Sequence, residues 1–243
     1  MRRAGRIAAA ARQIAGEMVA VGATTYSIDK KVRDFIVSQG ATPAFLGYNG
    51  FPANICVSVN EQVIHGIPSS RKLISGDIVS IDIGAVKDGF IGDCAATFIA
   101  GGGSAENEKL IEVTRECFFE ALQFARAGYR VSDISGAIQR HAEANGYSLV
   151  REYIGHGVGA KMHESPEIPN YIEVPRKRGD PRLLPGMTIA VEPMVNAGAA
   201  AIKILSDGWT VVTVDGKNSA HYENTILITD GAPEILTVCE DMP

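Results

Sequence analysis

Apolar residues recur at helical spacing along the first forty residues of the chain. The segment 2–21 is rich in alanine and is followed by Gly22, and glycine often stands just after a helix. A second segment runs from Ser27 to Gly40, and its apolar residues lie four, seven and eight positions after the first of them. They share one helical face and are Ile28, Val32, Phe35 and Ile36. The pattern therefore predicts two amphipathic helices.

From residue 54 to residue 100 the apolar positions form the short runs that are typical of β-strands. We expect strands at 55–59, 78–86 and 90–99. Three glycines at 101–103 then interrupt the pattern, and Ser104 or Asn107 is a candidate to cap the next helix.

The second half of the chain repeats this order of elements. Helices are expected over 105–127 and 131–145, each followed by a glycine. Strands are expected over 188–192, 210–214 and 219–229. Helix, helix, strands, twice in succession, predicts an α+β fold made of two similar halves.

The two halves are expected to form one domain, 1–243, with a site at the seam between them. This follows because no linker rich in proline, glycine or serine separates them. The proline-rich stretch 166–185 is expected to be a long loop, and loops of that length are often functional.

Composition narrows the class of protein. Hydrophobic residues make up 46% and charged residues 21% of the 243 residues, which suits a globular enzyme and excludes a largely disordered chain. The net charge of -5 gives no basic surface for nucleic acid. Four widely separated cysteines without a CxxC pair indicate reduced thiols. The apolar run before Arg12 is too short for a signal peptide, and no membrane-spanning run exists. We expect a cytoplasmic protein without nucleic-acid or membrane partners.

Two aspartates occupy consecutive predicted strands. Asp82 lies within an apolar run and Asp93 lies in the next strand, with Lys87, Asp88 and Gly89 between them as a hairpin turn. A two-residue loop at 87–88 places the aspartates directly opposite each other, and a loop at 88–89 places them one diagonal step apart. Both registers put the two carboxylates on one face of the sheet, whereas a three-residue loop needs a bulge to do so.

Two carboxylates this close on buried strands repel each other unless their charge is compensated. A shared proton or a bound cation compensates it, and a solvated sheet face removes the need for either. The cation is favoured by His156 in a glycine-rich turn, Glu192 at a strand end and Glu223 in the last strand. Four carboxylates and one imidazole exceed what one divalent ion needs. The set predicts two ions, with manganese, iron or cobalt favoured and zinc compatible.

These segments resemble those of the type I methionine aminopeptidases, which have the pita-bread fold. The similarity runs in order along nearly the whole chain, through ICVSVNEQVIHGIP (55–68), GDIVSIDIGAVKDGFIGDCAATF (76–98), GHGVGAKMHE (155–164), IAVEPMVN (189–196), DGWTV (207–211) and HYENT (221–225). The resemblance implies two pseudo-symmetric halves whose helices cover a curved antiparallel sheet. It also implies an enzyme that removes the initiator methionine from nascent proteins, with a preference for a small second residue.

The resemblance implies a role for each candidate ligand. Asp82 would chelate one ion, Asp93 and Glu223 would bridge both, and His156 with Glu192 would complete the other. A water or hydroxide between the two ions would attack the peptide bond, with Glu192 as general base and proton shuttle.

Further residues are implied on the substrate side. His163 would hydrogen-bond the scissile carbonyl and its developing oxyanion, and His65 would contact the substrate backbone beside the scissile amide. An aromatic and sulfur-bearing pocket that suits a thioether would be formed by Tyr48, Phe51, Cys56, Met162 and Trp209. Phe51 or Met162 alone would be interpreted as core, whereas the turn signal before Trp209 favours a pocket wall.

The chain departs from the family pattern at a few positions. His221 stands where glutamine is common and Asn224 where histidine is common, and Met162 stands where the family more often has an aromatic residue. His221 is two residues from Glu223, so on a strand both face one side. His221 then either reaches the outer shell of the metal site or has a packing role.

Two other functions are compatible with the same fold. One is an Xaa-Pro aminopeptidase or prolidase, which usually carries an added N-terminal domain for which 243 residues leave no room. The other is a non-catalytic binding protein, which typically loses ligands that are all present here. We expect a monomeric enzyme whose partner is a nascent polypeptide or peptide, with transient ribosome contact.

Overall fold

The computed structural model describes residues 1–172 and 179–239. Its helices are α1 (Arg2–Glu17), α2 (Thr25–Ser38), α3 (Ala105–Leu122) and α4 (Val131–Ala144), with one 3₁₀ turn, η1 (Tyr48–Gly50). Its strands are β1 (Thr42–Pro43), β2 (Cys56–Val59), β3 (Gln62–Ile64), β4 (Ile78–Lys87), β5 (Phe90–Ile99), β6 (Ser148–Leu149), β7 (Gly155–Gly157), β8 (Glu164–Ile168), β9 (Thr188–Val191), β10 (Met194–Asn196), β11 (Ile202–Ile204), β12 (Val211–Thr213), β13 (Ser219–His221), β14 (Glu223–Leu227) and β15 (Glu234–Ile235).

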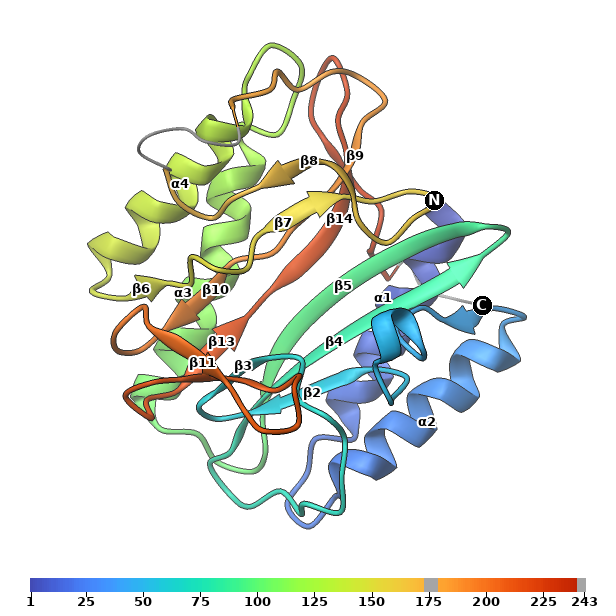
Figure 1. Ribbon diagram of the computed structural model, residues 1–243, viewed down its shortest axis with the longest axis vertical. Coiled ribbons are helices and arrows are strands. Elements are labelled where there is room, and N and C mark those ends of the chain that lie inside the picture. Colours follow the sequence, from blue (N-terminus) through green and yellow to red (C-terminus); the bar gives the residue numbers. More distant parts are fainter. Residues whose placement is uncertain (173–178, 240–243) are drawn as a thin grey trace.

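The strands form one large antiparallel sheet and two small ones. The large sheet has nine strands in the order β1-β4-β5-β14-β9-β7-β8, with β2 also paired to β4 and β15 to β14. The small sheets have the orders β13-β10-β6 and β11-β12-β3. In Figure 1, α1 and α2 lie with β4 and β5 on one side of the molecule, and α3 and α4 lie on the other. The predicted α+β fold with helices packed on an antiparallel sheet is confirmed.

Each half of the molecule has its own hydrophobic core. One core joins α1 and α2 to the odd-numbered residues of β4, among them Val79, Ile81 and Ile83. The other joins α3 and α4 to strands of the second half, among them residues Ile189 and Ile226. Because odd residues of β4 face the helices, its even residues face the opposite side of the sheet.

The hairpin between β4 and β5 has the register that places the two aspartates on a diagonal. Lys87 pairs with Phe90, so the loop is Asp88-Gly89, and both loop residues have positive φ, 52° and 79°. This is the geometry of a type I′ turn, which matches the twist of the strands. Asp82 pairs with Ala95 and Asp93 pairs with Gly84, so each carboxylate faces a small residue across the hairpin.

In the second half, a single register runs through β9–β10 and β13–β14. Asn224 pairs with Val191 and, further along the same register, Met194 pairs with His221. The strand predicted at 219–229 is therefore split in two at Tyr222, opposite Pro193. Proline has no N–H to donate to the ladder, which explains the interruption. The same register sets Glu192 directly opposite Glu223.

The seam between the halves is built with an internal two-fold repeat. Glu223 of β14 pairs with Ala95 of β5. On one side of this pair the Thr97 hydroxyl bonds both the amide and the carbonyl of His221, each at 2.9 Å. On the other side the Thr225 hydroxyl bonds both the amide and the carbonyl of Asp93, at 3.1 and 2.9 Å. Thr225 follows Thr97, and His221 follows Asp93, by the same 128 residues. His221 is thus the structural counterpart of Asp93.

Several predicted boundaries differ from the structure. The first helix stops at Glu17 rather than residue 21, and α3 stops at Leu122 rather than residue 127, because turns precede the expected glycines. The second helix starts before Ser27, since the Thr24 side chain caps it by accepting from the Ser27 amide at 3.1 Å. Ser104 rather than Asn107 caps α3.

The stretch predicted as a long loop, 166–185, begins within strand β8. Residues 173–178 of that stretch lie outside the described residues. His156, predicted in a turn, lies in the short strand β7. The described part of the chain has no helix long and apolar enough to cross a membrane.

Candidate metal centre

One cavity of about 280 Å³ brings the predicted site residues together. All twelve predicted site residues line it: Tyr48, Phe51, Cys56, His65, Asp82, Asp93, His156, Met162, His163, Glu192, Trp209 and Glu223. They come from β2, β4, β5, β7, β14 and from loops of both halves. His221 does not line the cavity.

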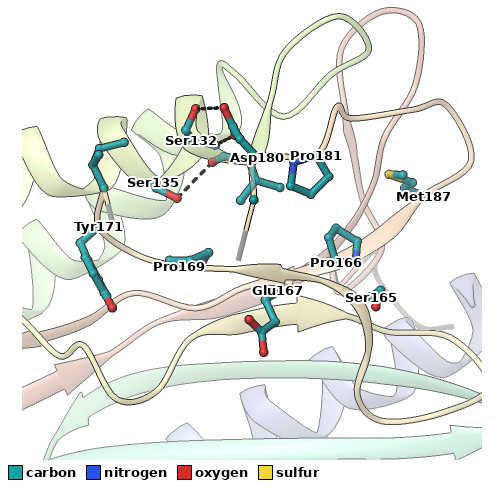
Figure 2. Close-up of a pocket in the computed structure, with 13 residues that line it drawn as sticks. Ser132, Ser135, Ser165, Pro166, Glu167, Pro169, Tyr171, Asp180, Pro181 and Met187 are labelled. Atoms are coloured by element: carbon teal, nitrogen blue, oxygen red, sulfur yellow. Dashed lines mark hydrogen bonds between the residues drawn. The ribbon is translucent and has the colours of Figure 1, made fainter. Parts of the chain in front are cut away.

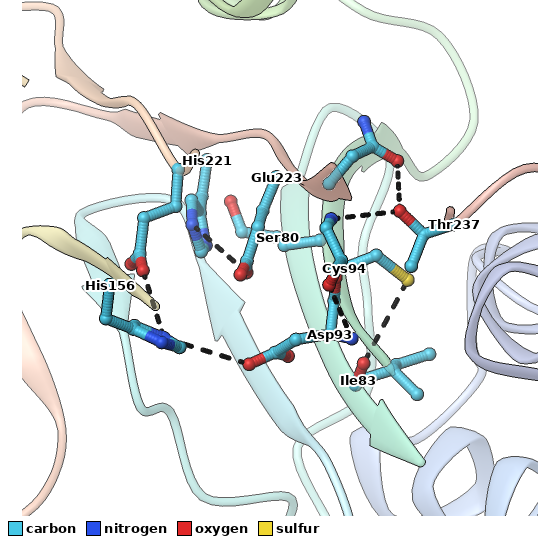
Figure 3. Close-up of polar contacts among 12 residues, drawn as sticks. Ser80, Ile83, Asp93, Cys94, His156, His221, Glu223 and Thr237 are labelled. Atoms are coloured by element: carbon cyan, nitrogen blue, oxygen red, sulfur yellow. Dashed lines mark hydrogen bonds and ion pairs between the residues drawn. The ribbon is translucent and has the colours of Figure 1, made fainter. Parts of the chain in front are cut away.

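The acidic residues and His156 converge at the floor of this cavity. Asp93, His156 and Glu223 each bring one potential ligand atom to within 4.8 Å of the others. Nε2 of His156 lies 3.4 Å from Oε1 of Glu192. It also lies 3.9 Å from Oδ2 of Asp93, as Figure 3 shows for this pair. Asp82 stands on the same sheet face, one diagonal step from Asp93.

Two glycines allow His156 to reach this position. A Cβ atom on Gly155 would collide with the carbonyl oxygen of Ala190, and one on Gly157 would collide with that of Ser165. The glycines therefore serve a close approach of β7 to the neighbouring backbone rather than the predicted turn.

The four carboxyl groups lie together, Asp93 and Glu223 fully buried and Asp82 and Glu192 mostly buried, with too few partners for their charge. Burial raises the pKa of Asp93 to about 7, and burial followed by the charge of Asp93 raises the pKa of Asp82, Glu192 and Glu223 well above the usual range. Among the described residues, Oδ1 of Asp82, Oδ1 of Asp93 and Oε1 of Glu223 are buried without a hydrogen-bond partner. Unpartnered buried carboxyl oxygens fit a site that holds a cation.

Burial favours the neutral form of the histidines in the cavity. Burial lowers the pKa of His156 and of His65 to about 4, and it also lowers the pKa of His163. Nδ1 of His156 donates to the carbonyl oxygen of Gly157 at 2.9 Å, so its lone pair is on Nε2, facing the carboxylates. A neutral imidazole with this tautomer can serve as a metal ligand.

The outer part of the cavity is aromatic. The rings of Phe51 and Trp209 meet edge to face with centroids 5.1 Å apart, and the Asp207 carboxylate accepts the Trp209 amide at 2.8 Å in the predicted turn. The Tyr48 hydroxyl lies 2.7 Å from Nδ1 of His163. His65 packs edge to face on the ring of Tyr153 at 5.3 Å.

His65 has an uncommon backbone conformation, with φ of 58°. A non-glycine residue in this region is held there by its surroundings at a cost of about 1–3 kcal/mol, and such strain clusters at functional sites. The conformation turns the side chain from the end of β3 into the cavity.

Five cavity-lining residues were not predicted from the sequence: Phe45, Asn49, Ile64, Tyr153 and Ile154. Each stands within three residues of a predicted site residue. Proximity in the chain was thus the available signal, and it could not say which neighbours face inward.

A larger cavity of about 480 Å³ lies beside α4, and Figure 2 shows Ser132 and Asp180 at its wall. The Ser132 hydroxyl donates to the Asp180 carboxylate at 2.9 Å. None of the twelve predicted site residues lines this cavity. We place the candidate site in the smaller cavity, because convergent groups with perturbed pKa values mark functional sites better than volume does.

Comparisons with known proteins agree with this geometry. The profile of metallopeptidase family M24 matches residues 1–230. The methionine aminopeptidase 1 of Bacillus subtilis is 52% identical over 237 residues, covering 98% of this chain and 94% of the relative. The crystal structure of methionine aminopeptidase from Thermotoga maritima superposes with a TM-score of 0.93 at 42% identity, covering 98% and 94% of the two chains. The prolidase from Pyrococcus furiosus shares the fold, with a TM-score of 0.77 at 24% identity, and 63% of its length is covered.

Proposed function

The chain belongs to metallopeptidase family M24, and we propose that it removes the N-terminal methionine from polypeptides with two divalent metal ions bound in the cavity. The observation that carries the proposal is the cluster of four carboxyl groups around His156, of which Asp82, Asp93 and Glu223 each have a buried oxygen without a hydrogen-bond partner among the described residues. It stands in a chain 52% identical to a methionine aminopeptidase.

The ions would be held by ligands from both halves. In this proposal Asp82, Asp93, His156, Glu192 and Glu223 would together hold the two ions. Such an oxygen-rich set suits manganese, iron or cobalt, and zinc is compatible. When bound, the ions supply Lewis acidity and lower the pKa of water to near neutrality.

The protein's own groups handle the proton and the substrate carbonyl. Glu192, mostly buried and with Oε1 3.4 Å from Nε2 of His156, is the general base that accepts a proton from water and passes it to the leaving amine. The Tyr48 hydroxyl lies 2.7 Å from Nδ1 of His163. With His163 in the tautomer that carries its proton on Nε2, Nδ1 accepts from Tyr48 and Nε2–H donates to the scissile carbonyl oxygen. His65 contacts the substrate backbone beside the scissile amide.

The side chain of methionine would enter the aromatic part of the cavity. Phe51, Cys56 and Met162 are each 4% exposed. The ring centroids of Trp209 and Phe51 are 5.1 Å apart. Sulfur close to aromatic rings is favourable, so this lining suits a thioether. The preference for a small second residue and transient ribosome contact stay predictions from the resemblance, and the monomeric state and the cytoplasmic location stay predictions from the sequence.

One assay tests the proposal against its nearest alternative. The purified protein is given a Met-Gly-Met peptide and, separately, an Xaa-Pro peptide, each with and without a chelator. We expect methionine release from the first peptide only, abolished by the chelator and restored by manganese or cobalt. Cleavage of the Xaa-Pro peptide alone would instead assign the prolidase activity. Inertness towards both peptides at every metal concentration would favour a binding protein.

A further inference from the structure

His221 is buried beside the candidate metal centre without being part of its cavity wall. Its side chain is 2% exposed, and its Nε2 has no hydrogen-bond partner among the described residues. That nitrogen lies 4.0 Å from Oε2 of Glu223, and Figure 3 shows the ring directed toward that carboxylate. Leaving a buried polar nitrogen unpaired is costly, so this arrangement needs a partner for His221.

The internal repeat gives His221 a position equivalent to that of a metal ligand. His221 and Asp93 are related by the repeat about the Glu223–Ala95 pair, each clamped by a threonine hydroxyl from the other half. Side chains at equivalent positions of a two-fold repeat approach the shared axis from opposite sides. Asp93 therefore faces the centre from one side, and His221 faces Glu223 from the other.

The backbone of His221 is held firmly enough to orient its ring. The Thr97 hydroxyl that bonds the amide and carbonyl of His221 is itself 2.8 Å from the Ser80 hydroxyl. His221 also pairs with Met194 in the ladder of β13 and β10. A ring fixed in this way can restrict the rotation of the carboxylate that it faces.

We propose that His221 is a positioning residue that donates its Nε2–H to the ionised Glu223 carboxylate and so raises the affinity of the centre for divalent ions. This inference rests on the proposed metal-binding role of Glu223. Groups that hydrogen-bond a metal ligand orient it, and their loss typically weakens metal affinity by about 10–100-fold.

Calorimetric titration of Mn²⁺ into chelator-treated protein tests the proposal. His221→Asn has an amide too short to reach Glu223, whereas the amide of His221→Gln extends about as far as Nε2 of histidine. We expect His221→Asn to weaken Mn²⁺ binding about tenfold or more and His221→Gln to stay within about threefold of the wild type. In a Glu223→Gln background, His221→Asn should cause no further loss.

A second histidine–glutamate pair provides the matched control. Nε2 of His141 lies 2.8 Å from Oε2 of Glu116, between α4 and α3 and outside the cavity, so His141→Asn should leave Mn²⁺ affinity unchanged. If His221→Asn fails to fold, His221→Met, which keeps the volume without a donor, takes its place with the same expectation. Wild-type Mn²⁺ affinity in the donor-free variant, or equal losses in the Gln and Asn variants, would overturn the proposal. Absence of Mn²⁺ binding by the wild type would instead reject the proposed metal centre.

Discussion

The two halves of the molecule follow the same plan with unequal regularity. In the first half, β4 and β5 are ten-residue strands joined by a two-residue turn and paired without interruption. In the second half, the equivalent ladder is interrupted at Pro193 and Tyr222, and residues 197–218 with β11 and β12 connect its strands. The regular half carries two short aspartates, and the interrupted half carries the longer side chains of His156, Glu192 and Glu223. The candidate centre thus combines two aspartates on a regular hairpin with three residues that an irregular backbone positions.

The largest effect is expected from the regular half. Asp93→Ala removes a proposed metal ligand, and kcat/KM for a Met-Gly-Met peptide should fall on the order of 10⁴-fold, because residues that act as a unit fail together. Asp88→Asn, in the turn of the same hairpin, tolerates the left-handed backbone and should leave turnover unchanged. Normal turnover by Asp93→Ala would show that the centre does not need the aspartate pair.

A somewhat smaller loss is expected from the interrupted half. Glu192→Gln removes the proposed base while it keeps an oxygen near His156, so kcat should fall by about 10³-fold, within the range of general-base removal. The control is Glu152→Gln, an exposed carboxylate on the same half. Metal content is measured in parallel, and a loss of activity that merely tracks a loss of metal would assign Glu192 to metal binding alone.

The melting temperature of the metal-free protein at two pH values tests whether folding buries the charge of Asp93. The pKa of Asp93 is raised in the folded state to about 7, above the roughly 4 of an unfolded aspartate. Its stability contribution is therefore complete below about pH 4 and is lost as the pH rises through 7. Chelator-treated Asp93→Asn should melt several degrees above chelator-treated wild type at pH 8, and this advantage should disappear at pH 4. An equal difference at both pH values contradicts the burial of an uncompensated charge.

The two threonines at the seam test whether the halves are equivalent in stability. Thr97→Val and Thr225→Val each leave a backbone amide and carbonyl of the other half without a partner. Each should lower the free energy of unfolding of the metal-free protein by about 1–3 kcal/mol in denaturant titrations. Thr114→Val, whose hydroxyl bonds the Leu110 carbonyl within α3, should cost less. If the two variants lose markedly different amounts of unfolding free energy, the two halves are equivalent in geometry but not in stability.

The smallest effect is expected at the edge of the cavity. Tyr48→Phe removes the hydroxyl that lies 2.7 Å from Nδ1 of His163 but keeps the ring. We expect kcat to fall by about three- to tenfold, the scale of one hydrogen bond, with KM little changed. His163→Ala should cost about 10²-fold, as the loss of an oxyanion donor does. If Tyr48→Phe is as severe as His163→Ala, the hydroxyl itself contacts the substrate.

The regular half was the more predictable one from the sequence. Alternation and turn chemistry restrict a hairpin register, so the amino-acid sequence alone places Asp82 and Asp93 on one face. Alternation does not choose between the two loop registers, because both obey it. The Asp88-Gly89 dipeptide is the signal that does, since both residues readily adopt the positive φ that a type I′ loop requires.

The interrupted half was less predictable. Pro193, opposite Tyr222, splits the strand predicted at 219–229. Gly155 and Gly157 are required by the close approach of neighbouring backbone. Both effects depend on residues far away in the sequence, so the local pattern does not reveal them. The ligand roles came from the resemblance to a known family, and the twelve residues that it named line one cavity. The repeat that relates His221 to Asp93 could not be recognised from the sequence, since residue identity between the halves is weak.

The narrow seam between β5 and β14 has a consequence for how the molecule comes apart. The backbone ladder between these strands has two residue pairs, supplemented by the Thr225 hydroxyl on Asp93, while each half keeps a hydrophobic core of its own. Ions held by ligands from both sides would act as cross-links and merge two cooperative units into one. Without them, amide hydrogens of β5 and β14 near the seam would exchange faster than those deep in either core. Loss of metal would then register first as a loosening between the halves, with the cores still protected.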